Sequence, residues 1–162
     1  MRRCCILFLF FSISLISNQP ASAQAEKVFE TKFTTIHYTD DAQIDSFIWR
    51  LGGHRLEYLN EPELASHRID RLIERVSMIL DMYPENFHIE IHLQQDPLPK
   101  NKIAYFEYET NAIYSSVDNV SDGVIAHELA HAIIVGYFPT PPPSKVQEIL
   151  AQYVDKQLWS DY

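Results

Sequence analysis

The sequence predicts an α+β fold in which a small, mixed and partly antiparallel sheet packs against helices. Three observations predict it. Segments with alternating β-branched and aromatic residues are interspersed with segments of helical periodicity. Two strand-like segments flank a short polar turn, as in a hairpin. Towards the C-terminus, two helical segments are separated by a proline-rich stretch.

The first half of the chain predicts two strands and two helices. Residues 28–39 are rich in β-branched and aromatic residues and predict one strand. Asp40 or Asp41 then caps a short helix that ends before a Gly-Gly pair. Residues 62–82 carry apolar side chains at helical spacing and predict the longest amphipathic helix, while residues 87–93 alternate and predict a half-buried strand.

A hairpin and two helices are expected in the second half. Residues 103–108 and 112–117 flank Glu-Thr-Asn and predict the hairpin. The first helix opens at Ser121, with an acidic residue in its first turn, and runs to about residue 135, where Gly136 and a proline-rich stretch end it. The second helix covers residues 144–159, and a Ser with a Gln three residues later, Ser144 and Gln147, predicts a capping box at its start.

The first 23 residues have the organisation of a secretory signal peptide. A basic start is followed by an apolar stretch of about 14 residues (4–17), and Ala-Ser-Ala at 21–23 supplies a cleavage signal. The apolar stretch is shorter than the roughly 20 residues that a membrane-spanning helix needs. We therefore expect export to the periplasm or the cell exterior, with residues 24–162 forming a single domain that has no membrane contact.

Composition narrows the function of the mature part. Both cysteines lie in the predicted signal peptide, so disulfides and cysteine-based zinc sites are excluded for residues 24–162. Without Arg2 and Arg3, 11 basic residues face 22 acidic ones, a formal net charge of −11. This charge argues against nucleic acids and anionic membranes as partners.

Residues 127–131 read HELAH, an H-E-x-x-H pattern inside a predicted helix with apolar flanks. Because positions i and i+4 lie on one helix face, His127 and His131 can direct their imidazole nitrogens at one ion, and imidazoles favour zinc. Glu128 follows the first ligand and is placed to act as the general base for a zinc-activated water. Its mid-helix position and apolar flanks distinguish the pattern from an accidental match on an ordinary amphipathic helix.

A catalytic zinc usually takes three protein ligands, so a third is required. The chain has no histidine after the motif, and Ile134 and Tyr137 stand where the metzincin pattern has a glycine and a last histidine, which excludes that pattern. The downstream carboxylates are Glu148, Asp155 and Asp161. Glu148 lies in the first full turn of the last helix, so a helix-turn-helix return would bring it back to the histidines.

HELAH followed by the proline-rich loop and EILAQYV at residues 148–154 resembles the gluzincin pattern, in which a second helix of the form E-G-x-A-E-Y supplies a glutamate ligand. The chain is most similar to peptidase MA-like domains, or minigluzincins, over about residues 103–158. This resemblance implies a zincin-like fold with an HExxH helix and a glutamate-ligand helix. It also implies one zinc ion per chain, held by His127, His131 and Glu148, and hydrolysis of peptide bonds in peptide or protein substrates.

Other residues have candidate supporting roles. The family often has a carboxylate at the position of Gln152 that orients the first histidine; the amide oxygen of Gln152 accepts a hydrogen bond more weakly, and Asp155 is a possible substitute. Tyr137 and Tyr153 are candidates to stabilise an oxyanion, although a packing role is the simpler interpretation of each. An extended substrate could pair with the edge of the strand at residues 112–117.

Five further histidines suggest no second site from the sequence. His88 and His92 share a predicted strand face but lie four residues, about 13 Å, apart, so they cannot bind one ion. His37, His54 and His67 have no partner that the sequence identifies.

Three functions stay open. The first is an active exported zinc metallopeptidase, which the intact Glu128 favours. The second is a catalytically inactive zincin-fold binding or regulatory module, which the small size and Gln152 favour. The third is a structural protein with an accidental HELAH, which predicts that no metal binds.

Overall fold

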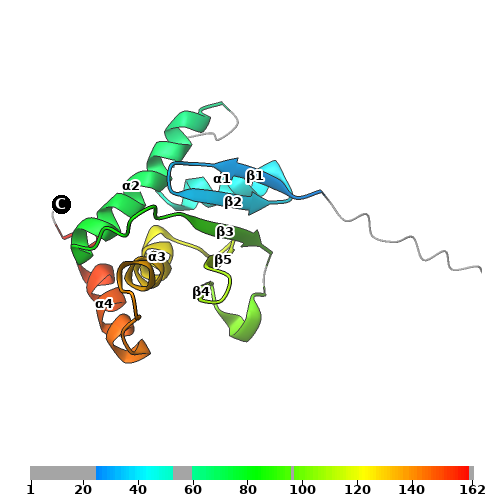
Figure 1. The fold of residues 1–162 in the computed structure, drawn as a ribbon. Coiled ribbons are helices and arrows are strands. Elements are labelled where there is room, and N and C mark those ends of the chain that lie inside the picture. The colour runs from blue at the N-terminus through cyan, green and yellow to red at the C-terminus, as the bar shows by residue number, and fades with distance from the viewer. Residues whose placement is uncertain (1–24, 53–59, 96, 161–162) are drawn as a thin grey trace, which may run out of the picture.

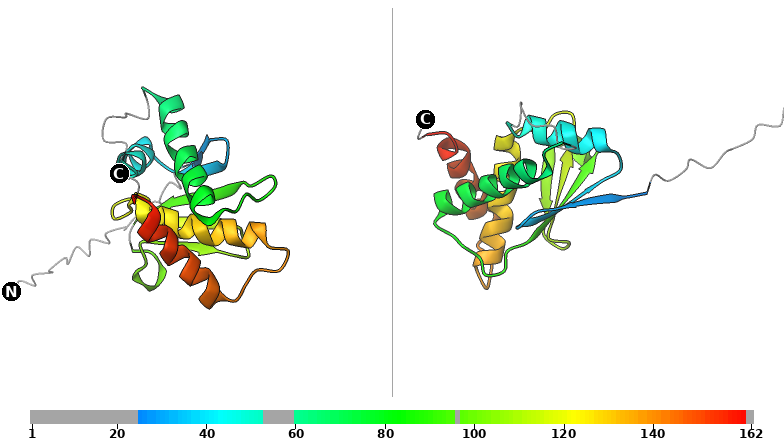
Figure 2. Two further views of the ribbon diagram at one scale, coloured as in Figure 1. Left: turned by 90° about the vertical axis from the view of Figure 1, so that its left-hand side faces the viewer. Right: turned by 90° about the horizontal axis from the view of Figure 1, so that it is seen from above.

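The computed structural model describes residues 25–52, 60–95 and 97–160 (Figures 1 and 2). Within them the chain forms a five-stranded mixed sheet, four α-helices and a short 3-10 turn. The prediction of an α+β fold with a mixed, partly antiparallel sheet on helices is therefore confirmed. The predicted signal peptide and His54 lie outside the described residues. None of the helices described combines the length and apolar character that crossing a membrane requires.

The sheet has the order β1-β2-β3-β5-β4, with parallel pairs in the centre and antiparallel pairs at both edges. Its strands are β1 (Lys27–Glu30), β2 (Thr34–Tyr38), β3 (Ile89–Gln94), β4 (Ala104–Glu107) and β5 (Ala112–Ser116). The predicted hairpin is confirmed, since β4 pairs antiparallel with β5. Because β5 lies between β3 and β4, the free edge on this side belongs to β4.

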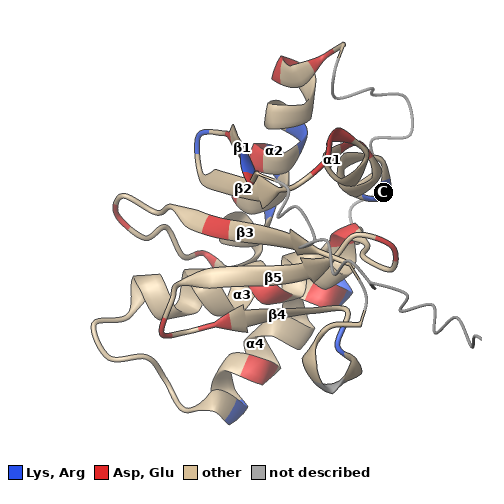
Figure 3. Ribbon diagram, turned by 90° about the vertical axis from the view of Figure 1, so that its right-hand side faces the viewer, with Lys and Arg blue, Asp and Glu red and all other residues tan. Residues whose placement is uncertain are grey.

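The two faces of the sheet have different environments. Along β2 and β3 buried and partly exposed residues alternate, so Ile36 and Ile91 enter the core while His37 and His92 point the other way. Helix α3 (Asp122–Tyr137) packs against β4 and β5. Figure 3 looks onto the sheet with α3 and α4 behind the strands, and we call the face turned towards the viewer there the open face.

The N-terminal segment differs from its prediction. Residues 28–39 form two antiparallel strands, β1 and β2, joined by a tight turn, so the single predicted strand is wrong. Thr31 Oγ1 donates to Asp70 Oδ1 at 2.7 Å, and the backbone N–H groups of Lys32 and Phe33 donate to the same carboxylate at 3.3 and 3.4 Å. The turn is therefore completed by a side chain from a distant helix.

The first two helices begin where the sequence indicates. Helix α1 (Asp41–Arg50) is capped by Asp40, whose Oδ1 accepts from the Ala42 N–H at 2.7 Å. Helix α2 (Pro62–Leu80) has a proline in its first turn, where no intrahelical N–H is required. Helix α2 carries Asp70, the carboxylate that completes the β1–β2 turn.

Helices α3 and α4 (Ser144–Gln157) position the HELAH motif and the residues that follow it. Ser121 caps α3 as predicted, accepting from the Val124 N–H at 3.4 Å. Gly136 does not end α3 but lies inside it, beside Pro84 and Phe87.

The predicted capping box at the start of α4 is wrong. Pro143 is the N-cap residue, and it has no side-chain cap hydrogen bond. The Gln147 amide instead donates to the Pro142 carbonyl at 2.8 Å and ties the proline-rich loop to the helix. The first turn of α4 is thus held from the loop side.

Candidate metal centre

Helix α3 presents the three motif residues on one side of its middle turns. The His127 and His131 rings have centroids 5.1 Å apart and lie at 66° to each other. Both side chains are mostly buried, with 23% and 18% of their surface exposed. Their neighbours Leu129 and Ala130 are in the core, so the helix backbone that carries the motif is fixed by packing.

Glu148 of α4 lies against both histidines. Its Oε2 is 3.7 Å from His127 Nε2 and 3.6 Å from His131 Nε2, and the donor atoms of the three residues lie within 4.8 Å of one another. A tetrahedral zinc with bonds of about 2.0–2.1 Å separates its ligand atoms by about 3.3–3.5 Å. Two imidazoles and one carboxylate therefore fit a zinc ion with small movements of the side chains.

Asp155, rather than Gln152, lies behind the first histidine. Asp155 Oδ2 is 3.0 Å from His127 Nδ1. Because a carboxylate can only accept, His127 donates from Nδ1, which leaves the lone pair of Nε2 facing Glu148. The substitute role considered for Asp155 thus agrees with the geometry.

Gln152 instead acts on the glutamate. Its amide nitrogen donates to Glu148 Oε1 at 3.0 Å, so it does not orient His127. This hydrogen bond lowers the pKa of Glu148 below its ordinary value; partial burial opposes the shift, and the nearby His127 and His131 add to it. The carboxylate that faces the histidines is thus stabilised in its charged form, the form in which it binds a metal.

Glu128 connects α3 to the edge of the sheet. Its Oε2 accepts a hydrogen bond of 2.8 Å from the backbone N–H of Phe106 in β4. The expectation that an extended substrate pairs with residues 112–117 is wrong, because β5 has neighbours on both sides. The free edge on this side belongs to β4, and its backbone contacts Glu128 directly.

Two adjoining cavities make a groove along this edge. One has a volume of about 610 Å³ and the other about 560 Å³. Both are lined by Lys102, His127 and Glu128, and they extend towards Trp159 in one direction and Tyr108 in the other. An extended chain in this groove would pass the motif with room on both sides of it.

The two tyrosines considered as oxyanion stabilisers do not line the groove. Tyr137 packs edge-on against Phe138 at the end of α3, and Tyr153 lines a separate depression with Arg75. Tyr108, which is 60% exposed, lines the same part of the groove as His131 and Glu148. Its only sequence signal was its position at the end of a predicted hairpin strand, which does not show which helix that end approaches.

The structure thus brings together four predicted residues, His127, Glu128, His131 and Glu148. Asp155 and Gln152 each hold one of the four in position. A scan against protein-family models, a search of curated proteins and a search of solved structures each found no match.

Proposed function

We propose that this chain is an exported zinc-dependent peptidase of the gluzincin type with a zincin-like fold. The observation that carries the proposal is the convergence of His127 Nε2, His131 Nε2 and Glu148 Oε2 beside Glu128, in a groove bordered by an open strand edge. Three protein ligands and a neighbouring base are the arrangement of a catalytic zinc site, whereas structural zinc sites use four ligands.

The residues divide the chemistry among them. Zinc, when bound, acts as a Lewis acid that polarises the substrate carbonyl and lowers the pKa of water. His127, His131 and Glu148 hold the ion, Asp155 orients His127 through Nδ1, and Gln152 orients Glu148.

Glu128 moves the proton. Its Oε2 is held by the Phe106 N–H, so Oε1 is left to take a proton from the attacking water. As the new C–O bond forms and the C–N bond breaks, Glu128 gives this proton to the leaving amine. Glu128 thus accepts one proton and later releases it, so it is ionised again at the end of the reaction.

The β4 edge supports a peptide as the substrate. An extended chain can add to an unpaired strand edge through backbone hydrogen bonds, which recognise any peptide regardless of its side chains. Because the groove continues on both sides of His127 and Glu128, we infer cleavage within a chain rather than at its end.

Hydrolysis of a mixed peptide library by the purified mature protein tests the proposal. Zinc content is measured on the same sample by elemental analysis. We expect about one zinc at this centre and cleavage of internal peptide bonds, with Glu128→Gln lowering the rate by about 10²–10⁴-fold while zinc is retained. Glu85→Gln, at an exposed loop residue, is the control and should match wild type. The proposal would be contradicted if the protein bound stoichiometric zinc but showed no peptide cleavage that Glu128→Gln lowers.

One observation favours the second candidate, an inactive binding module. The Phe106 N–H, which a substrate strand would need, is already bonded to Glu128. In a module of this kind Glu128 would stay bonded to Phe106, and peptides would bind in the groove beside it without being cleaved. Peptide binding that survives Glu128→Gln, together with no hydrolysis at any zinc concentration, would favour it over the peptidase.

A further inference from the structure

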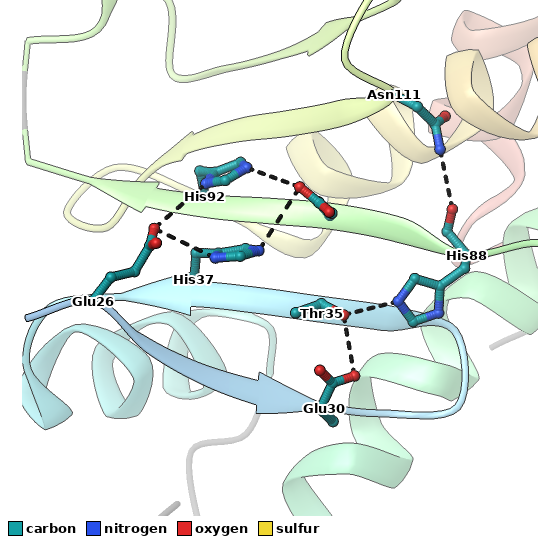
Figure 4. Close-up of polar contacts among 8 residues, drawn as sticks. Glu26, Glu30, Thr35, His37, His88, His92 and Asn111 are labelled. Atoms are coloured by element: carbon teal, nitrogen blue, oxygen red, sulfur yellow. Dashed lines mark hydrogen bonds and ion pairs between the residues drawn. The ribbon is translucent and has the colours of Figure 1, made fainter.

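A second group of metal-binding side chains lies on the open face of the sheet (Figure 4). His37 of β2 and His92 of β3 are register partners on neighbouring parallel strands, so their side chains stand next to each other. Glu26, just before β1, reaches both from the edge of the sheet. The sequence identified no partner for His37, and the structure places His92 and Glu26 beside it.

The three donor groups converge. Glu26 Oε1 is 3.4 Å from His37 Nδ1 and 4.0 Å from His92 Nδ1, and one ligand atom from each residue lies within 4.8 Å of the others. The first distance equals the spacing of about 3.3–3.5 Å between ligands of a tetrahedral zinc, and the second requires a closing movement of roughly half an ångström.

His37 has polar atoms that the protein leaves unsatisfied. Both ring nitrogens are buried and form no hydrogen bond. Burying an imidazole nitrogen without a partner costs free energy, so such an atom needs an explanation, and a bound ion at Nδ1 supplies one.

A second carboxylate lies at the opposite edge of the histidine pair. Glu90 Oε2 is 3.4 Å from His92 Nε2 and 3.8 Å from His37 Nε2. With an ion on the Nδ1 side, Glu90 would accept hydrogen bonds from the two Nε2 atoms and so keep the Nδ1 lone pairs free for the ion. No Lys or Arg among the described residues pairs with Glu26 or Glu90, so the cluster lacks a cation.

The histidines are also held rigidly. Their rings stack with centroids 4.3 Å apart and 17° between planes. Tyr114 stacks on the other side of His92 at 5.0 Å, and Tyr105 continues the row on Tyr114 at 5.1 Å. Because the two rings are nearly parallel, binding one ion through both Nδ1 atoms requires the rings to tilt towards each other.

We propose that Glu26, His37 and His92 bind one divalent transition-metal ion through Glu26 Oε1 and the two Nδ1 atoms. Two imidazoles and one carboxylate suit zinc, cobalt, nickel or copper, whereas calcium and magnesium prefer oxygen ligands. The ion fastens the chain before the edge strand β1 to β2 and β3. This site does not depend on the proposed peptidase function.

Zinc binding to the mature chain tests this site. The wild type, His131→Ala, and His131→Ala combined with His37→Gln are each dialysed against micromolar zinc, and bound metal is measured by mass spectrometry. We expect two ions per chain in the wild type, one in His131→Ala and none in the double variant. In the His131→Ala background, Glu26→Gln should weaken binding by about tenfold or more.

His88→Gln is the matched control. His88 lies on the same face just before β3, hydrogen-bonded to Thr35 at 2.9 Å and outside the cluster (Figure 4), and its substitution should leave the stoichiometry unchanged. Nitrogen NMR in the His131→Ala background should show zinc shifting the ring signals of His37 and His92 but not those of His88.

The outcomes separate the two metal sites. If the double variant fails to fold, Glu26→Gln gives the same test, because Glu26 is an exposed residue that precedes β1. The proposal is overturned if, in the His131→Ala background, neither His37→Gln nor Glu26→Gln lowers the amount of bound zinc. It is also overturned if His88→Gln lowers that amount as much as they do. One ion in both wild type and His131→Ala, lost with His37→Gln, would instead keep this site and remove the candidate centre on α3.

Discussion

Two clusters in this molecule have the same donor set, two histidines and one glutamate, but different surroundings. The cluster of α3 and α4 lies beside a groove and has a carboxylate, Glu128, that binds neither histidine. The cluster on the open face has its spare carboxylate, Glu90, at the far edge of both rings. With the same ligands in both clusters, the groups beside them differ, and those groups determine whether chemistry can follow the binding of an ion.

The backbone that holds each cluster also differs. His127 and His131 are one helical turn apart, and Glu148 is on the next helix. His37 and His92 are brought together only by the pairing of β2 with β3, and Glu26 by the chain that leads into β1. The first site is thus fixed mainly by local structure, and the second by the assembly of the sheet.

Removing one ligand from each cluster should give the largest contrast. We expect His127→Ala to abolish peptide hydrolysis and to remove one zinc per chain, because two ligands hold zinc poorly. His92→Gln should also remove one zinc but leave hydrolysis within about twofold, since the two sites share no residue. Equal loss of activity in both variants, measured by peptide turnover at saturating zinc, would show that the sites do not act separately.

Asp155→Asn tests the support of the α3 cluster. The amide can still accept from His127 Nδ1, but more weakly than the carboxylate, so we expect zinc affinity to fall about 10–100-fold. Competition with a chromogenic chelator measures the change. Asp118→Asn, at an exposed turn residue, is the control and should behave as wild type; a similar loss there would mean that net charge, not orientation, sets the affinity.

Zinc at the open-face cluster should stabilise the edge of the sheet. In the His131→Ala background, zinc at about 100 times its dissociation constant would add about 2.7 kcal/mol to the free energy of unfolding. Bound zinc should also slow the amide hydrogen exchange that occurs through local opening, and it should do so mainly in β1 and β2. If zinc slowed exchange equally in α4, the ion would not be acting by fastening the chain before β1 to β2 and β3.

The smallest effect concerns the charge of Glu148. Gln152 holds its pKa below the ordinary value, so the stability that this carboxylate contributes is present above its unfolded-state pKa and is lost as the pH falls through the lower folded-state pKa. Gln152→Ala should raise the pKa of Glu148. Carbon NMR titration of the metal-free protein measures it, with Gln157→Ala as a control on the same helix; an unmoved midpoint would exclude a role for Gln152.

The α3 site could be predicted because its determinants are close in sequence. The spacing of His127 and His131 already fixes a common helix face, and one short loop separates their helix from Glu148. Asp155 was recognised only as an alternative to Gln152, because which of the two faces His127 depends on the rotation of α4 against α3. That rotation is a result of packing.

Other features depend on tertiary contacts that no local pattern records. The turn between β1 and β2 has no Gly, Pro or Asn, and its partner Asp70 lies 39 residues from Thr31. Likewise, the pairing of His37 with His92 requires the register of two strands that α1 and α2 separate in sequence. Residue propensities predicted extended structure in both regions, but they did not predict which part of the molecule each strand contacts.

The hydrogen bond from the Phe106 N–H to Glu128 also bears on self-association. Unpaired strand edges are where one molecule can add to the sheet of another and begin an aggregate. The exposed edge of β4 is only four residues long, and one of its outward-facing amides is occupied by Glu128. The same carboxylate that we propose as the base therefore also leaves this edge with one donor fewer for pairing with a second copy.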